Sequence, residues 1–394
     1  MSDPQPAREV REVREDGVRA SADEAAPASR RPSRTNGGGR ITRGDTQIGR
    51  GFAALMAGVA TLVLGATVMS VPVPFVVGVP GPTYNALGSA DGKDVISVAG
   101  HDTYPASGAL DLTTVYMRGG PASDVGLVEL ARSWFDSSRE ILPEDVVYPK
   151  GVTRQQISDE NAAQMDDSQH TAVAAALREL GIPFEQQLNV GSVPDGSPSS
   201  GKLRAGDRLL KVAGRAADTL PAVQEAVAAG QGAPVEVVVL RDGAQVTQTV
   251  TPTNNSGRWL LGIGIRYSFT FPFTVDVQLS NVGGPSAGMM FALAIYDKLT
   301  PGDLTGGKHI AGTGAIGPDG RVGSIGGIAQ KLHGARDAGA TLFLAPAGNC
   351  DEVVGHIPDG LAVVKVSTLN DARTAVEGYA RGEDPAGMPQ CTAR

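Results

Sequence analysis

The chain has 394 residues and a formal net charge of −8 at neutral pH, and this length predicts roughly two to three compact units. Its acidic balance argues against nucleic acid as a partner. The five histidines and two cysteines show no metal-ligand spacing, so the sequence predicts no metal site.

Residues 1–50 mix arginine, acidic residues, proline and glycine with almost no large apolar side chains. Such a composition does not bury a core, and we expect a disordered tail. Residues 51–75 carry no charged side chain. Within them, the apolar stretch Phe52–Val71 is long enough, at about 1.5 Å per residue, to cross a bilayer core of about 30 Å. We therefore expect a transmembrane anchor.

The charge flanking this stretch predicts its orientation. Six arginines and one acidic residue lie between residues 30 and 50, which places the N-terminus in the cytoplasm and the remainder outside. A cleaved signal peptide is the rival interpretation. The 50-residue leader and the lack of a clean small-x-small cleavage site favour a retained, single-pass anchor in the cell membrane.

Residues 76–165 give a weaker pattern. Ala109–Tyr116 resembles a strand and Val125–Trp134 an amphipathic helix. We expect an extracytoplasmic α/β region here, and its role is not indicated by any motif.

Residues 166–256 suggest a peptide-binding module. A helical segment, Leu220–Ala229, precedes an alternating hairpin, Val235–Val250, which turns at Asp242-Gly243. The run Gly201–Leu210 is similar to PDZ domains of bacterial envelope proteases, which bind an extended peptide as an added strand. Leu180, Gly181 and Ile182 resemble the loop that accepts a terminal carboxylate. The same three residues are also typical of a helix stop, and both interpretations stay open.

Residues 257–394 contain a candidate nucleophile. Ser286 follows Pro285 and opens a run that is apolar on every face, as expected of a buried helix. Free N–H groups at such a helix start, those of Gly284 and Ala287 among them, would form an oxyanion hole. The alternative is an ordinary serine cap with a glycine turn before it.

A candidate base lies 45 positions downstream. Ile328, Lys331, Leu332 and Ala335 follow the spacing of one helix face, so Lys331 points where the apolar residues point. Burial lowers the pKa of an ammonium group, and a neutral lysine activates a serine hydroxyl. The alternative is a lysine whose head extends to water.

Three separated motifs resemble the Lon-type (S16) serine proteases. They are Gly284–Gly288, Gly312–Ile316 and Gly320–Lys331, in family order, and the resemblance covers roughly residues 258–380. It implies that Ser286 is the nucleophile, Lys331 the general base and Thr313 the hydroxyl that positions the amine. Gly283 and Ala315 depart from the family pattern, which often has acidic residues there. Assembly into homo-oligomeric rings is a further implication of the family.

Lon proteases usually carry an ATPase, and this chain lacks its motif. Gly302–His309 approaches a phosphate loop but has histidine in place of the magnesium-binding Ser or Thr. We therefore expect no nucleotide and no cofactor. Cys350 and Cys391 are the two cysteines, and in an extracytoplasmic domain we expect them to form a disulfide. Two unpaired thiols are the alternative.

Nearly the whole chain resembles membrane-anchored bacterial proteins that combine PDZ and Lon domains. The predicted fold is a multidomain α+β protein with an N-terminal transmembrane helix, a PDZ-like domain and a Lon-type proteolytic α/β domain. The predicted function is an ATP-independent Ser-Lys endopeptidase of the cell envelope that cleaves extracytoplasmic polypeptides recruited through the PDZ domain. The alternative is a proteolytically inactive PDZ scaffold or adaptor.

Overall fold

The computed structural model describes residues 45–69, 71–90, 92–279 and 282–392. Its contacts divide the chain into two units, residues 1–62 and 63–394. The tail expected over residues 1–50 lies outside the described residues up to position 44.

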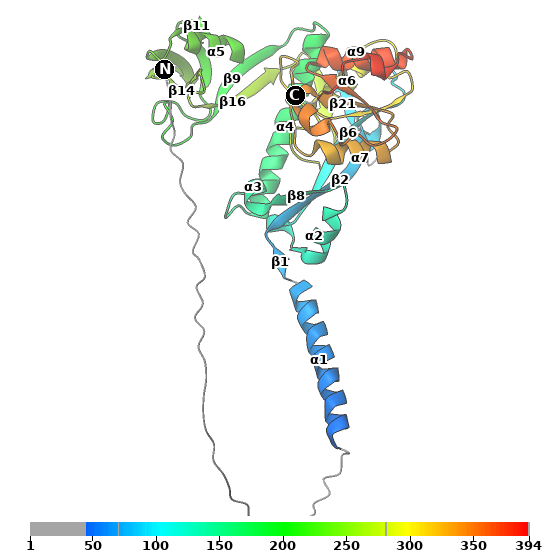
Figure 1. The fold of residues 1–394 in the computed structure, drawn as a ribbon. Coiled ribbons are helices and arrows are strands. Elements are labelled where there is room, and N and C mark those ends of the chain that lie inside the picture. The colour runs from blue at the N-terminus through cyan, green and yellow to red at the C-terminus, as the bar shows by residue number, and fades with distance from the viewer. Residues whose placement is uncertain (1–44, 70, 91, 280–281, 393–394) are drawn as a thin grey trace, which may run out of the picture. The chain divides into compact units, whose positions relative to one another are not determined.

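Helix α1 (Asp45–Met69) belongs to both units. Its stretch Gly51–Met69 is long and apolar enough to cross a membrane, and none of it is buried against the described chain. A signal sequence passes the same test of length and composition. The stretch covers the first 19 residues of the anchor expected over residues 51–75, whereas Pro72 and Val73 already belong to a strand (Figure 1).

A six-stranded sheet forms the centre of the second unit, in the order β22-β21-β18-β6-β2-β8. Strands β6, β18, β21 and β22 run parallel, whereas β2 is antiparallel to both β6 and β8. The strands are β2 (Phe75–Asn85), β6 (Ala109–Arg118), β8 (Glu140–Pro143), β18 (His309–Gly312), β21 (Leu342–Pro346) and β22 (Ala362–Val366).

This sheet corrects the boundary expected at residue 165. The main strands of residues 76–165 do not form a separate sheet, because β2, β6 and β8 continue the sheet of residues 309–366. Strand β5 (Ile96–Ala99) likewise pairs with β17 (Thr274–Val277). The reason is physical: Leu110 and Leu112 of β6 are fully buried, and buried backbone groups require hydrogen-bond partners. Here part of that pairing comes from β18, whose residues lie 200 positions downstream of their partners in β6, and no local pattern reveals it.

Helices cover both faces of the sheet (Figure 1). Strand β21 shows the alternation: Leu342 and Leu344 face one core, and Phe343 faces the other. Burial on both faces explains why β21 is apolar throughout. One core holds α4 (Arg154–Glu179), α6 (Gly288–Leu299) and α9 (Leu369–Ala380), and the other holds α7 (Ile328–Asp337) and α8 (Cys350–Val353).

A second sheet has the order β13-β12-β10-β9-β16. Asp242 and Gly243 both have positive φ, which confirms the expected hairpin turn between β12 and β13. The elements are β9 (Glu185–Ser192), β10 (Arg208–Val212), β11 (Arg215–Ala216), α5 (Leu220–Ala229), β12 (Val235–Arg241), β13 (Ala244–Val250), β14 (Thr253–Asn255), β15 (Arg258–Leu260) and β16 (Gly264–Thr270).

The bounds of this PDZ-like module differ from the expected residues 166–256. Strand β16 lies beyond residue 256, yet it pairs with β9 along the whole length of that strand. Helix α4 begins before residue 166 and packs against α6, which covers one face of the first sheet. The sheet therefore spans residues 185–270, and α4 belongs to the core of the other sheet.

Several short elements complete the second unit. Strand β1 (Pro72–Val73) pairs with β7 (Val125–Gly126), and this pair lies directly before α2 (Leu127–Trp134). The others are β3 (Ser89–Ala90), β4 (Lys93–Asp94), η1 (Gly120–Ala122), α3 (Glu144–Val147), β19 (Ala315–Ile316), β20 (Val322–Gly323), η2 (Ala347–Asn349) and η3 (Pro385–Gly387).

A disulfide joins Cys350, at the start of α8, to Cys391 near the C-terminus. The two residues are 41 positions apart, so the bond removes considerable freedom from the unfolded chain. We expect Cys391→Ser to lower the free energy of unfolding by about 2–4 kcal/mol. Urea unfolding of both proteins, with and without reductant, measures this. Reductant should lower the stability of the native protein but not that of Cys391→Ser. Equal stability of the two proteins in the absence of reductant would contradict the prediction.

Candidate active site

Ser286 lies in the turn before α6 and not inside that helix, which begins at Gly288. Its backbone carbonyl accepts two hydrogen bonds, from the Gly314 N–H (2.8 Å) and from the Thr313 hydroxyl (3.0 Å). The Met289 N–H donates in turn to the Gly314 carbonyl (3.0 Å). The segment that carries the serine is thus held against residues 313–314, while the serine itself is half-buried.

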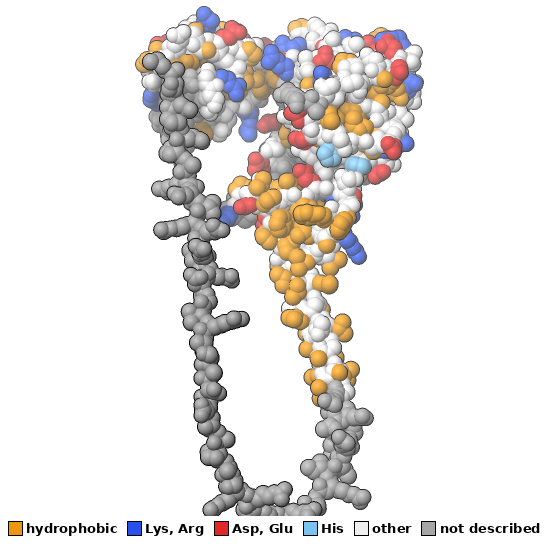
Figure 2. Space-filling model, in the orientation of Figure 1, with side chains coloured by type: hydrophobic (Ala, Val, Ile, Leu, Met, Phe, Trp, Pro, Cys, Tyr) orange, Lys and Arg blue, Asp and Glu red, His pale blue; other side chains and the backbone are white. Residues whose placement is uncertain are grey.

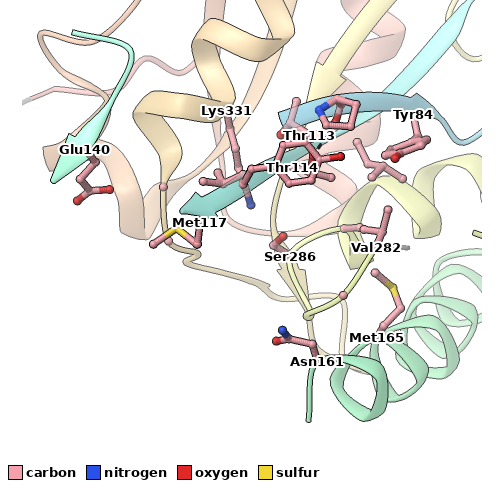
Figure 3. A pocket seen from close by; sticks show the side chains of 18 of the residues that line it. Tyr84, Thr113, Thr114, Met117, Glu140, Asn161, Met165, Val282, Ser286 and Lys331 are labelled. Atoms are coloured by element: carbon pink, nitrogen blue, oxygen red, sulfur yellow. Dashed lines mark hydrogen bonds between the residues drawn. The ribbon is translucent and has the colours of Figure 1, made fainter. Parts of the chain in front are cut away.

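Lys331 lies on the buried face of α7 and is 3% exposed. Its Nζ donates a hydrogen bond to Thr313 Oγ1 (3.1 Å), and Thr313 is itself buried. A continuous chain therefore runs from the Lys331 amine through the Thr313 hydroxyl to the Ser286 carbonyl. Within the described residues, no direct hydrogen bond joins Lys331 Nζ to Ser286 Oγ. Figure 3 shows both side chains at one cavity.

Burial determines the charge of the Lys331 amine. Loss of hydration lowers the pKa of Lys331 from 10.5 to about 7. No carboxylate forms an ion pair with this amine in the part of the chain that the structure describes. A substantial fraction of the amine is consequently neutral near pH 7, the state in which a lysine accepts a proton.

The expected oxyanion donors require a correction at Gly284. Its N–H donates to the backbone carbonyl of Asn161 on α4 (3.0 Å), so it is not free to bind a developing anion. The Ala287 N–H has no acceptor among the described residues. Ala287 precedes the first residue of α6, where the helix dipole favours negative charge.

A cavity of about 480 Å³ brings Ser286 and Lys331 together with residues from distant parts of the chain. Beyond Leu112, strand β6 contributes five consecutive residues, Thr113–Met117. Pairing between β6 and β18 ends at Leu112, so beyond that point one edge of β6 is unpaired within the described residues. The rest of the lining is Pro82, Tyr84, Leu112, Glu140, Leu142, Val147, Asn161, Met165, Val282, Gly283, Ala287, Gly326 and Gly327 (Figure 3).

Most of these lining residues carry no sequence signal of function. The strand pattern of residues 109–116 indicates β6, but nothing in it indicates that the strand borders the candidate active site. His309 and His333, the other conceivable bases nearby in sequence, do not line the cavity. His309 instead contacts Asp111 through Nε2 (2.6 Å).

The carboxylate-binding role expected of Leu180, Gly181 and Ile182 is wrong for this structure. The three N–H groups donate to the carbonyls of Ala176, Arg178 and Leu177, at 3.0, 3.0 and 2.9 Å. The last two bonds, with Gly181 at φ 70°, form a Schellman motif that ends α4. The helix-stop interpretation therefore holds, because these donors are already used.

A separate pocket of about 430 Å³ lies between β9 and the start of α5. It is lined by Phe184–Gln187, Asp218 and Thr219, together with Arg178 and Arg208. Strand β9 pairs with β10 at Asn189 alone, so its edge before that residue is open within the described chain. This pocket, and not the Leu180–Ile182 turn, combines a strand edge with a neighbouring helix.

Comparison with known proteins supports a Lon-type protease over part of the chain. Residues 280–376 match the model of the Lon protease (S16) C-terminal proteolytic domain. The Lon protease of Clostridioides difficile (strain 630) is 41% identical over 78 residues, 20% of this chain and 10% of that protein. Lon protease 1 of Bacillus subtilis (strain 168) is 34% identical over 116 residues, 28% of this chain and 15% of that protein. The chain thus spans a small part of these relatives.

Solved structures of PDZ domains resemble about a fifth of the chain. The PDZ domain of the SdrC-like protein from Listeria monocytogenes shows 21% identity, a TM-score of 0.19, and coverage of 20% of this chain and 85% of that one. Its counterpart from Listeria innocua shows 20% identity, a TM-score of 0.19, and coverage of 20% and 92%. The expected resemblance to Lon-type proteases is confirmed for residues 280–376.

The buried amine has a testable effect on stability. The pKa of Lys331 is about 7 in the folded protein but 10.5 when exposed. Below pH 7 the folded and unfolded chains are both protonated, and the full cost of burying the charge applies. Between pH 7 and 10.5 the unfolded chain binds more protons, so stability rises with pH. We expect Lys331→Met to raise the free energy of unfolding at pH 6 by on the order of 3–5 kcal/mol.

This gain should shrink as the pH approaches 10. Urea unfolding at several pH values measures it, and Lys211→Met serves as the control because Lys211 is exposed. A gain for Lys331→Met that is the same at every pH, or as small as that of Lys211→Met, would show that the amine is hydrated.

Proposed function

We propose that this chain is an ATP-independent, membrane-anchored serine endopeptidase in which Ser286 is the nucleophile and Lys331 the general base. The observation that supports it best is the dehydrated Lys331 amine, which is linked through Thr313 to the segment carrying Ser286. The similarity of residues 280–376 to the Lon proteolytic domain points to the same activity.

In this proposal the neutral Lys331 amine takes the proton of the Ser286 hydroxyl as Oγ attacks a peptide carbonyl. Thr313 orients the amine because its Oγ1 accepts a hydrogen bond from Lys331 Nζ. The Ala287 N–H stabilises the oxyanion of the tetrahedral intermediate. Protonated Lys331 then donates its proton to the leaving amine, and an ester to Ser286 remains. Water, deprotonated by the same lysine, hydrolyses that ester and restores the serine.

The substrate in this proposal is an extended polypeptide. The open edge of β6 at Thr113–Met117 presents backbone donors and acceptors, to which another strand adds by hydrogen bonding. The apolar side chains of Val115, Leu142 and Met165 in the lining favour an apolar substrate residue there. The segment Gly302–Lys308 leads into strand β18 and not into a helix, which supports independence from ATP. Flexible or unfolded segments are therefore the proposed substrates.

Substrate recruitment is proposed for the PDZ-like sheet. The pocket between β9 and α5 pairs an open strand edge with a helix, the arrangement that binds a peptide by strand addition. Membrane attachment is proposed for α1, with the catalytic unit outside the cytoplasm, on the evidence of its apolar stretch and the arginines before it.

The catalytic proposal predicts a specific set of variants. Ser286→Ala and Lys331→Ala should each lower peptidase kcat by at least about 10³-fold, and the double variant should be little worse, because the two residues act as one unit. Lys331→Arg should be equally inactive, since a guanidinium group stays protonated. Activity of the native enzyme should rise with pH through about 7, as Lys331 deprotonates. Cleavage of an unstructured peptide, followed by mass spectrometry, measures all of these.

Thr313→Val should slow the reaction by roughly 10–100-fold without unfolding the protein, since it removes the hydroxyl and nearly preserves volume. Lys211→Arg, at an exposed position, is the matched control. Near-native activity of purified Lys331→Arg would exclude the dyad. The scaffold alternative would be favoured instead if Ser286→Ala still bound its envelope partners and this binding accounted for the whole phenotype of the native protein.

Excision of the PDZ-like sheet tests recruitment. Glu185 and Thr270 are directly paired across β9 and β16, so residues 186–269 can be replaced by two glycines without separating the chain ends. We expect cleavage of a short unstructured peptide to persist, because Ser286, Thr313 and Lys331 lie outside the excised part. Cleavage of full-length membrane proteins should fall by about tenfold or more. Equal loss of both activities in a folded variant would mean that the module belongs to the active site.

A further inference from the structure

Helix α2 exposes its apolar face. Leu127, Val128 and Ala131, together with Trp134 and Phe135 just after them, follow the spacing of a single helix stripe. All five are exposed, Trp134 at 77% and Phe135 at 89%. We call these five residues the α2 stripe.

The opposite side of the helix shows the converse. Ser133 is only 3% exposed, and its hydroxyl has no hydrogen-bond partner among the described residues. A surface helix normally buries its apolar side and exposes its polar side. The reversed arrangement indicates that something apolar covers the α2 stripe.

The position of α2 indicates what covers it. Strand β7, immediately before α2, pairs with β1, and Gly126 lies opposite Pro72. Pro72 follows the end of the apolar helix at Met69 by three residues, a span of about 10 Å at most. Helix α3 is tied to the same place, because the Glu144 N–H donates to the Pro74 carbonyl (3.1 Å). It adds Val146, which is 72% exposed.

Hydrophobic side chains accordingly gather around α2 on the surface of the second unit (Figure 2). We propose that the α2 stripe and Val146 lie in the interfacial layer of the bilayer that α1 crosses, with α2 parallel to the membrane plane. This inference rests on the proposed membrane anchoring. Tryptophan favours the headgroup level, and an amphipathic helix with aromatic anchors lies in that layer.

Contact of α2 with the bilayer would also fix the distance of the catalytic cavity from the membrane surface. Strand β8 follows α2 in the chain, and its residues Glu140 and Leu142 line that cavity. The lipid contact would therefore hold the cavity near the membrane surface, where segments of other membrane proteins emerge.

The two tryptophans of the chain allow a direct test. Full-length protein is reconstituted into phosphatidylcholine vesicles as two matched variants. Trp259→Phe leaves Trp134 as the sole emitter, and Trp134→Phe leaves Trp259, which lies in β15 and packs against the core of the PDZ-like module. Lipid brominated near the top of the acyl chain quenches a tryptophan that it touches, whereas acrylamide quenches one in water.

We expect brominated lipid to reduce Trp134 emission by roughly half or more, while acrylamide acts weakly on it. Trp259 should be insensitive to brominated lipid. If Trp259→Phe fails to fold, the native chain compared with Trp134→Phe gives the same information by difference.

Resistance of the protein to high-salt washing reports the anchoring separately. A protein that stays in the membrane while Trp134 is quenched by acrylamide alone overturns the inference and leaves the proposed function intact. Protection of Trp134 from both quenchers overturns it in favour of a second copy of the chain as the covering surface. Release of the protein on washing overturns the inference together with the proposed anchoring.

Discussion

The dehydrated amine of Lys331 is the constraint on which the candidate site depends. A lysine in water is protonated at neutral pH and accepts nothing, and burial lowers the pKa of Lys331 to about 7. To be buried, this side chain must be surrounded by protein atoms on every side. Helix α7 carries Lys331, Thr313 directly after β18 supplies the hydroxyl that accepts a hydrogen bond from the amine, and β6 lines the cavity. The cost in stability is the reason such an arrangement is rarely found without a function.

The sheet explains how distant segments meet at this amine. Strand β6 pairs with β18 on one side and with β2 on the other, so strands before position 144 complete a sheet whose remaining strands lie after position 308. The parallel pairing of β6 with β18 stops at Gly312, immediately before Thr313. Loss of the neighbouring strand at that point leaves the edge of β6 open beside the serine. The register of β6 against β18 therefore determines both where the Thr313 hydroxyl lies and where an extended chain has room to bind.

The PDZ-like sheet is joined to the rest through its two neighbouring strands β9 and β16. Strand β16 closes the sheet and then leads to β17, which pairs with β5 of the other part of the unit. At the other end, a Schellman motif at Gly181 turns the chain out of α4. Arg178, in the last turn of α4, donates to the Pro318 carbonyl (2.7 Å) and so ties that turn to the segment after β19.

The sequence by itself determined the elements whose signal is local. The apolar stretch of α1, the hairpin at Asp242-Gly243 and the buried face of α7 each follow from the spacing of neighbouring residues. The three Lon-like motifs determined the resemblance of residues 280–376. Only the tertiary structure decided that β6 borders Ser286 and that the Gly284 N–H is already bonded to Asn161. Both depend on contacts between residues more than 100 positions apart, and hydrogen-bond partners at that separation leave no trace in a periodic pattern.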